Sequence, residues 1–206
     1  MTKEQLITSF QKHFNTTPEV YFSPGRVNII GEHTDYNNGY VMPIAINMGT
    51  FVAIAKRDDT SVNVYSENLK DSTSFKLENT QTIVENTWQN YIKGTLKSIE
   101  QKTDAKLVGA DIYIYSNLPF GAGLSSSASL TTVICYAYND LYGLNLSKLD
   151  MAKISQTVEH SFIGTKCGIM DQMACVFSIQ NNATLIDCDD YSIQNIPFEL
   201  DDKCLL

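Results

Sequence analysis

The order of the patterned segments predicts an α+β fold, in which a β-sheet carries helices on one face. Alternating apolar and polar residues, the period of a strand, gather toward the two ends of the chain. Segments with apolar residues three and four apart, the period of a helix, occupy the middle. With 206 residues, 43% of them apolar, the chain can bury a sizeable core as one large or two small domains.

The N-terminal third begins with an amphipathic helix and continues with strands. Residues 3–14 place Leu6, Phe10 and Phe14 on one helical face. A short strand is expected at residues 19–23, and Pro24-Gly25 is expected to close it. Further strands are expected at residues 40–46, 50–57, 62–65 and 73–77, the last three as a meander.

The remainder of the chain alternates between the two periods. Helices are expected at residues 86–101, 128–141 and 146–162. Strands are expected at residues 110–115, 183–187 and 193–198.

The segment LPFGAGLSSSASL, residues 118–130, lies between an expected strand and an expected helix. Gly121 and Gly123 let the backbone approach an anion, and serines 125–127 add hydroxyls at a helix start with unpaired N–H groups. An ordinary capped turn is the simpler interpretation, but one cap needs one hydroxyl and three serines stand here. The segment is neither GxxxxGK[ST] nor GxGxxG. We therefore expect it to bind a phosphate.

The segment GRVNIIGEHTDY, residues 25–36, flanks an apolar centre with an unusual density of polar groups. Glu32 and Asp35 can accept hydrogen bonds from a polyhydroxy ligand, and Arg26 can hold an anion. A charged turn in which Arg26 pairs with Glu32 explains the pattern equally well. His33 alone is more often a structural histidine.

Three further positions are ambiguous when the residues are taken alone. Asp171 stands among apolar and small residues and is either a helix cap, which is slightly favoured, or a functional carboxylate. Trp88 and Tyr91 have the spacing of core aromatics. Glu159 falls in a late helical turn, where a glutamate is usually solvated and its charge opposes the helix dipole.

Composition and charge exclude several classes of function. The net charge is 15 − 23 = −8, so a surface for nucleic acid or an anionic membrane is not expected. No run of about 18 apolar residues is present, so no membrane span is expected. Five cysteines without a CxxC pair, and no signal peptide, predict reduced thiols in a cytoplasmic protein. Nothing in the pattern calls for an obligate protein partner.

Both motifs resemble those of a known enzyme family. GRVNIIGEHTDY resembles the galactokinase signature at every position that the signature specifies, and LPFGAGLSSSASL resembles the ATP-phosphate motif of the galactose, homoserine, mevalonate and phosphomevalonate (GHMP) kinases. The resemblance runs from Phe22 to the last residue. It implies that residues 1–206 form the two-layer GHMP kinase N-terminal domain, a mixed sheet with helices on one face, and that residues 1–47 carry the galactose-binding signature.

The resemblance also implies an activity and a set of site residues. The activity is ATP-dependent phosphorylation of galactose at its C1 hydroxyl, the first committed step of galactose catabolism, with Mg²⁺. Asp171 would be the catalytic base or the orienter of the attacking hydroxyl, and Arg26 would keep it ionised. The sugar would be bound by Glu32, His33, Asp35, Gly168 and Asp171. ATP would be bound by Gly121, Ala122, Gly123, Leu124, Ser125, Ser126 and Ser127, with Trp88 and Tyr91 bordering the adenine. The metal would be held by Ser127 and Glu159.

Two rival interpretations and one departure from the family stay open. A non-catalytic galactose- and ATP-binding regulator of the same fold would tend to lose residues of the serine loop, whereas this chain keeps residues 125–128 and Asp171. A kinase for a related sugar such as N-acetylgalactosamine would need a roomier pocket, which sequence does not reveal. The family is about twice as long and the end, residues 203–206, is partly apolar, so an N-terminal fragment without the C-terminal domain is expected.

Overall fold

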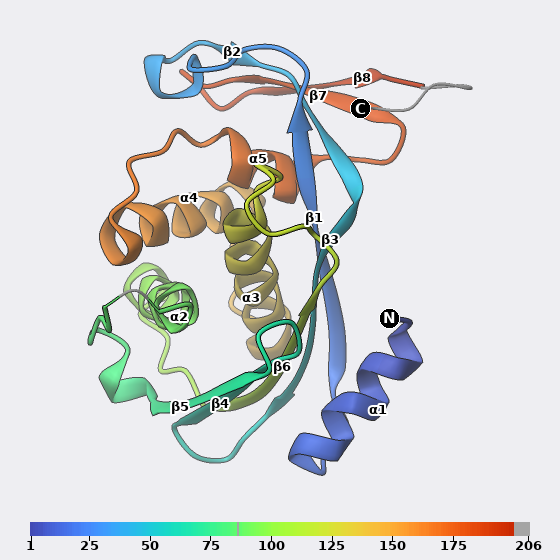
Figure 1. The fold of residues 1–206 in the computed structure, drawn as a ribbon. Coiled ribbons are helices and arrows are strands. Elements are labelled where there is room, and N and C mark those ends of the chain that lie inside the picture. The colour runs from blue at the N-terminus through green and yellow to red at the C-terminus, as the bar shows by residue number, and fades with distance from the viewer. Residues whose placement is uncertain (86, 200–206) are drawn as a thin grey trace.

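A computed structural model of the chain describes residues 1–85 and 87–199, and this part contains five α-helices and two β-sheets (Figure 1). The predicted α+β class is confirmed. The helices are α1 (Lys3–Phe14), α2 (Gln89–Thr103), α3 (Ser126–Tyr142), α4 (Lys148–Val158) and α5 (Met170–Phe177). The strands are β1 (Glu19–Asn28), β2 (Tyr40–Val41), β3 (Pro43–Lys56), β4 (Ser61–Ser66), β5 (Asp71–Lys76), β6 (Ala110–Ser116), β7 (Asn182–Asp187) and β8 (Ile193–Pro197). Short 3₁₀ turns occupy Asp35–Asn37 and Leu77–Asn79, and a π-helical turn occupies Glu159–Ile163.

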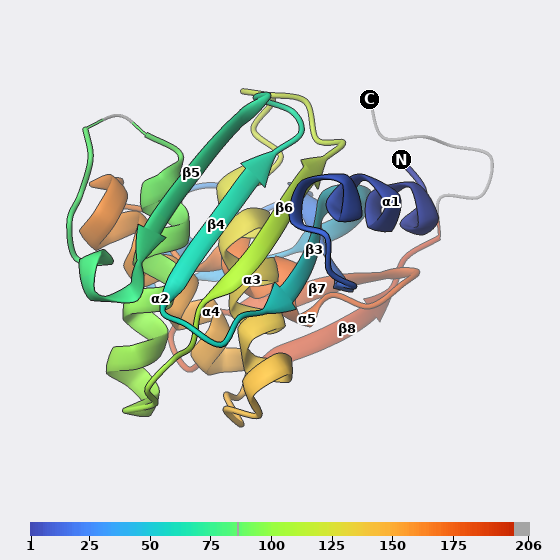
Figure 2. The ribbon, with the colours of Figure 1, turned by 90° about the horizontal axis from the view of Figure 1, so that it is seen from below.

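The larger sheet has five strands in the order β1-β3-β6-β4-β5. Strand β6 lies between β3 and β4, antiparallel to the first and parallel to the second. The predicted meander of residues 50–57, 62–65 and 73–77 is therefore wrong at its first step, because β3 and β4 are not neighbours. Figure 2 shows β6 between these two strands.

Helices α2, α3, α4 and α5 cover one face of the five-stranded sheet (Figure 1). Alternate residues of the strands point into this layer, as the two-residue period of a strand requires. Val52 and Ile54 of β3 and Ile112 of β6 join buried residues of α2 and α3 such as Leu96 and Ile134 in the main core.

The opposite face of the same sheet carries one helix, α1 (Figure 1). Leu6 and Phe10 pack there against Ala53 and Ala55 of β3 and Tyr113 of β6, the residues that alternate with those of the main core. The expectation of helices on one face holds for α2 to α5, and α1 adds a helix on the other. The uninterrupted apolar run at residues 51–55 is typical of a strand buried on both faces.

A smaller sheet, in the order β2-β7-β8, lies next to α4 and α5 (Figure 1). Val41 of β2 and Ile186 of β7 pack against Ala152 of α4 and Met173 of α5. None of the helices described for this chain is both long and apolar enough to cross a membrane.

Several predicted boundaries differ from the observed ones. Strand β1 does not end at Pro24-Gly25 but continues to Asn28 through a register shift between Pro24 and Arg26. The proline is tolerated because β1 is an edge strand, where a missing N–H removes little of the ladder. The predicted strand at residues 40–46 is interrupted at Met42, and its second part runs on through residues 50–56 as β3.

The predicted helix at residues 146–162 ends as α4 at Val158, and the π-helical turn follows it. The predicted start of the α2 helix at Asn86, and the partly apolar end at residues 203–206, lie outside the described residues.

Candidate functional site

The glycine- and serine-rich segment forms the connection between β6 and α3, as its sequence predicts. Gly121 and Gly123 both have positive φ, 70° and 68°, a conformation that favours glycine. Ser125, the residue before the helix, is also left-handed, with φ 59° and ψ 43°, and its side chain does not cap α3. We call residues 118–127 the glycine-serine loop.

Asp171 and Arg26 form an ion pair beside this loop. The Nε and Nη2 atoms of Arg26 donate to Oδ1 of Asp171 at 2.8 and 2.5 Å, and both side chains are mostly buried. The alternative pairing of Arg26 with Glu32 is wrong, because Glu32 instead accepts a hydrogen bond from Asn28 at 2.9 Å. Asp171 is the second residue of α5 and Ile169 is its N-cap, so the slightly favoured capping role of Asp171 is wrong as well.

The loop is bonded to both members of the pair. Nη1 of Arg26 donates to the carbonyl oxygen of Gly123 at 2.7 Å, and the Arg26 backbone N–H donates to that of Leu124 at 3.2 Å. Oγ of Ser125 donates to Oδ2 of Asp171 at 2.6 Å. The glycine-serine loop and Asp171 therefore lie on the same side of the sheet and in direct contact.

Glu159 is buried next to the start of α3. Its exposed fraction is 5%, and the π-helical turn places it after α4. Burial raises the pKa of its carboxyl group, the Ser127 hydroxyl lowers it by hydrogen bonding, and the negative charge of Asp171 raises it again. A buried glutamate is costly unless a partner compensates its charge, so this position is not the solvated residue that a helix end suggests.

A cavity of about 240 Å³ opens beside the serines. Trp88 and Tyr91 line it together with Ser126, Ser127 and Leu118. Burial, with the charge of Glu159, raises the pKa of Tyr91. The two aromatic residues and the serine-bearing helix start thus border one space, although 34 residues lie between Tyr91 and Ser126 in the chain.

The predicted sugar-binding residues follow β1 and approach the N-terminus of α5. Oδ2 of Asp35 accepts a hydrogen bond from the backbone N–H of Met170 at 3.4 Å. A Cβ on Gly168 would lie 1.9 Å from this same oxygen, so only glycine fits. Glu32 and His33 are exposed, and Nδ1 of His33 is 2.7 Å from the Tyr36 hydroxyl. Asp35, Gly168 and Asp171 are thereby grouped at one end of α5.

Gly25 is a site residue that the sequence analysis took only as a strand end. A Cβ there would lie 2.6 Å from the Leu124 carbonyl oxygen and 2.6 Å from a methyl group of Leu118. The absence of a side chain lets the glycine-serine loop approach β1 and reach Arg26. The sequence could have indicated this role, because Gly25 is the first residue of the GRVNIIGEHTDY motif.

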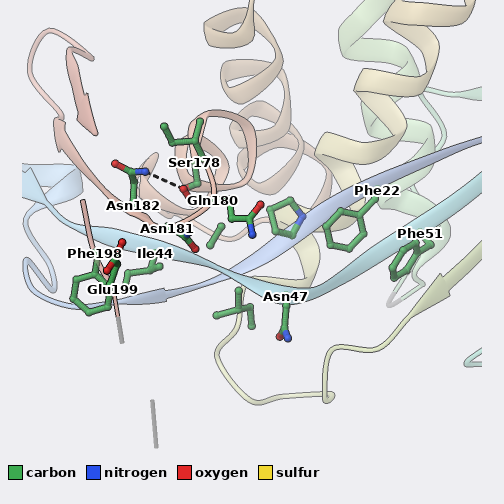
Figure 3. Close-up of a pocket in the computed structure, with 14 residues that line it drawn as sticks. Phe22, Ile44, Asn47, Phe51, Ser178, Gln180, Asn181, Asn182, Phe198 and Glu199 are labelled. Atoms are coloured by element: carbon green, nitrogen blue, oxygen red, sulfur yellow. Dashed lines mark hydrogen bonds between the residues drawn. The ribbon is translucent and has the colours of Figure 1, made fainter. Parts of the chain in front are cut away.

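A larger hollow of about 1000 Å³ lies beside β1 and β3 (Figure 3). Phe22, Phe51, Ile44 and Asn182 are among the residues around it. None of the predicted site residues lines this hollow. Within residues 1–85 and 87–199, no group of three or more His, Cys, Asp or Glu side chains is arranged to hold a metal ion by itself.

Parts of the chain match the models of two known protein domains. Residues 90–178 match the model of the GHMP kinases N terminal domain, and residues 8–56 match the galactokinase galactose-binding signature. The fold, with a glycine-serine loop facing Asp171 and Arg26, is that of a GHMP kinase N-terminal domain.

Within that class, the chain is related to the galactokinases and corresponds to their N-terminal half. It is 42% identical over 193 residues to the galactokinase of Chloroflexus aggregans, covering 93% of this chain and 49% of that protein. It is 39% identical over 209 residues to the galactokinase of Streptococcus suis, covering 100% and 54%. The crystal structure of Lactococcus lactis galactokinase complexed with galactose matches with a TM-score of 0.91 and 36% identity over 96% of this chain and 52% of that one. The chain thus spans about half the length of the curated relatives it matches.

Proposed function

We propose that this chain is the N-terminal domain of an enzyme that transfers the γ-phosphoryl group of ATP to the C1 hydroxyl of α-D-galactose. The product is galactose 1-phosphate, in the first committed step of galactose catabolism, the Leloir pathway. The contact of Arg26 and Ser125 with Asp171 carries the proposal, because it joins a carboxylate to an anion-binding loop. In this assignment the whole chain, residues 1–206, is one domain, and residues 1–47 hold the galactose signature.

ATP occupies the cavity and the loop. Trp88 and Tyr91 contact the adenine, and the helix start with residues 121–127 holds the phosphates through backbone N–H groups and the exposed Ser126 hydroxyl. A loose phosphoryl transition state needs positioning and charge neutralisation more than covalent help, which suits a site built of backbone donors and one guanidinium.

Ser127 and Glu159 offer oxygen ligands of the kind that Mg²⁺ prefers, and Mg²⁺ usually keeps several waters and phosphate oxygens besides. Because burial raises the pKa of Glu159, a cation beside it would stabilise the charged carboxylate. The bound ion would neutralise charge on the transferred group.

The sugar lies between the loop after β1 and the start of α5. Glu32, His33, Asp35 and Gly168 bind its hydroxyls, and Asp171 takes the proton of the C1 hydroxyl while that oxygen attacks the γ-phosphorus. The bond from the γ-phosphorus to the β–γ bridging oxygen breaks, and ADP leaves. Arg26 compensates the negative charge of Asp171 and offsets charge on the phosphoryl group.

An ADP-release assay on the complete protein, with galactose, N-acetylgalactosamine, arabinose and mevalonate, tests this function. We expect turnover with galactose, and weak or no turnover from the 206-residue chain alone. Preferential use of N-acetylgalactosamine would favour the related-sugar kinase. Binding of galactose and ATP without ADP release would favour the non-catalytic regulator. The four cysteines described, all unpaired, support a cytoplasmic location.

A further inference from the structure

The three consecutive serines of the glycine-serine loop have three different surroundings. Ser126 is exposed and lines the cavity with Trp88 and Tyr91. Ser127 lines the same cavity, and its side chain lowers the pKa of the neighbouring Glu159. Ser125 is buried, and its hydroxyl donates to Oδ2 of Asp171 at 2.6 Å. Successive residues at a helix start point about 100° apart, which is why neighbouring serines reach different partners.

Ser125 occupies a position that an ordinary capping serine would not. Its backbone is left-handed, a conformation that serine rarely adopts and that glycine adopts freely. Its hydroxyl does not cap α3, the usual reason for a serine before a helix. The left-handed backbone is unfavourable for serine, and the missing cap is unfavourable for the start of α3. In this conformation the Ser125 side chain bonds Asp171 instead of the helix.

Asp171 is therefore held from two sides. Arg26 engages Oδ1 with two donors, and Ser125 engages Oδ2 with one. Arg26 itself is bonded to the carbonyl oxygens of Gly123 and Leu124, the two residues before Ser125. A carboxylate with both oxygens bonded keeps one rotamer. The glycine-serine loop makes one of these bonds through Ser125 and holds Arg26, which makes the other two, and it is the loop to which the proposed function assigns the phosphates.

We propose that Ser125 is a positioning residue for Asp171, and that its hydroxyl does not bind ATP. This role rests on the proposed function. It assigns the serines separately, with Ser125 to the carboxylate, Ser126 to the nucleotide and Ser127 to the metal. The loop thereby links the conformation that binds phosphate to the orientation of the group that accepts the proton.

The test compares Ser125→Gly with Ser125→Ala in the complete protein. Both variants lose the hydroxyl, but glycine also relieves the left-handed backbone, so Ser125→Gly should be the more stable of the two. We expect kcat to fall by a similar factor in both, about 10- to 100-fold as for loss of a hydrogen bond to a charged group, with the KM for ATP within about twofold of wild type. A phosphate-binding hydroxyl would instead raise the KM for ATP, and activities that follow thermal stability would assign Ser125 a purely structural role. Either result overturns the proposal.

A double-mutant cycle separates this proposal from the proposed function. Unfolding of the 206-residue chain is measured for wild type, Ser125→Gly, Asp171→Ala and the double variant, and needs no turnover. We expect the two changes to be non-additive, and in the complete protein we expect Ser125→Gly to lower kcat little further once Asp171 is absent. Additive effects on unfolding overturn the positioning role even if galactose is phosphorylated. A complete protein that phosphorylates no sugar overturns the proposed function, and this role with it, whatever the cycle shows.

Discussion

Asp171 receives three hydrogen bonds, two from Arg26 and one from Ser125, and its side chain stays partly exposed and so accessible to a ligand. If it accepts the proton of the sugar hydroxyl, Asp171→Asn in the complete protein should lower kcat by about 10²- to 10⁴-fold, the usual contribution of a general base. ATP affinity should change little, because Asp171 does not line the cavity bordered by Trp88 and Tyr91, which we propose as the nucleotide site.

Steady-state kinetics and ATP titration measure both quantities. Asp104→Asn is a matched control, because Asp104 is exposed at the left-handed C-cap of α2, where asparagine is well tolerated. An Asp171→Asn variant with near-normal kcat would remove the base assignment.

Gly168 gives a second test at the scale of one residue. Because its Cβ would lie 1.9 Å from Oδ2 of Asp35, Gly168→Ala must displace that carboxylate. We expect the KM for galactose to rise at least about tenfold and the melting temperature to fall, as for other overpacking changes. In the double variant with Asp35→Ala, the melting temperature should recover while the KM stays high. Unchanged galactose kinetics in Gly168→Ala would argue against sugar binding by Asp35.

Taken alone, the residues made Arg26 and Asp171 candidates but did not pair them, and they left Glu159 as a solvated residue; the pairing of Arg26 with Asp171 came from the family resemblance. Arg26 and Asp171 are 145 residues apart, so their contact depends on how β1 and α5 pack and not on any local pattern. The direction of the Ser125 hydroxyl could not be predicted either, because it follows from a left-handed backbone conformation that the sequence does not specify. The roles themselves came from the resemblance of the motifs.

The π-helical turn after α4 is the element that carries Glu159 inward. Such turns are frequent at functional sites, because they change the direction of side chains within a helix. Burial raises the pKa of Glu159 above its ordinary value of 4.5. The protonated form is thus favoured by folding, and the stability it contributes is present below about pH 4.5 and lost as pH rises through the higher folded value.

Glu159→Gln, which stays neutral, should therefore gain stability over wild type as the pH is raised from about 4 to 7. Urea unfolding across this range in the 206-residue chain measures the difference. In the complete protein the same variant should need more magnesium for half-maximal activity. A pH-independent difference would contradict the burial argument, and an unchanged magnesium titration would count against the metal site.

At the scale of elements, hydrophobic period predicted type and approximate extent well. The α1 helix was expected at residues 3–14 and is found there. Strand β6 starts where expected and ends one residue later, and α3 starts two residues earlier and ends one residue later than expected. The order of strands was missed, because alternation indicates that a segment is a strand but not which strand it pairs with. Pro24 and Gly25 looked like a turn, yet at a sheet edge they make a bulge.

In the whole molecule, the five-stranded sheet lies between the α1 core, which contributes to stability, and the face that carries the candidate site. Phe10 of α1 is fully buried on the face opposite to α2–α5, where it packs with Ala53 and Tyr113. Phe10→Ala should lower the free energy of unfolding by about 3–5 kcal/mol. The KM values for galactose and ATP should not change, because no site residue lies on that face.

Chemical denaturation and kinetics below the melting temperature check this separation, with Phe10→Leu as a milder control that keeps most of the buried volume. A large change in either KM for Phe10→Ala would mean that the two faces of the sheet are coupled.

The insertion of β6 between β3 and β4 has a consequence for the nascent polypeptide. While the ribosome is still adding residues 57–109, the inner edge of β3 has no partner, since the strand that covers it has not been made. Until then the β3 edge of the β1–β3 pair exposes unpaired N–H and C=O groups, which can pair with other chains and lead to aggregation. Chaperone contact during synthesis should accordingly peak before residue 110 leaves the exit tunnel and decline once residues 110–116 have paired.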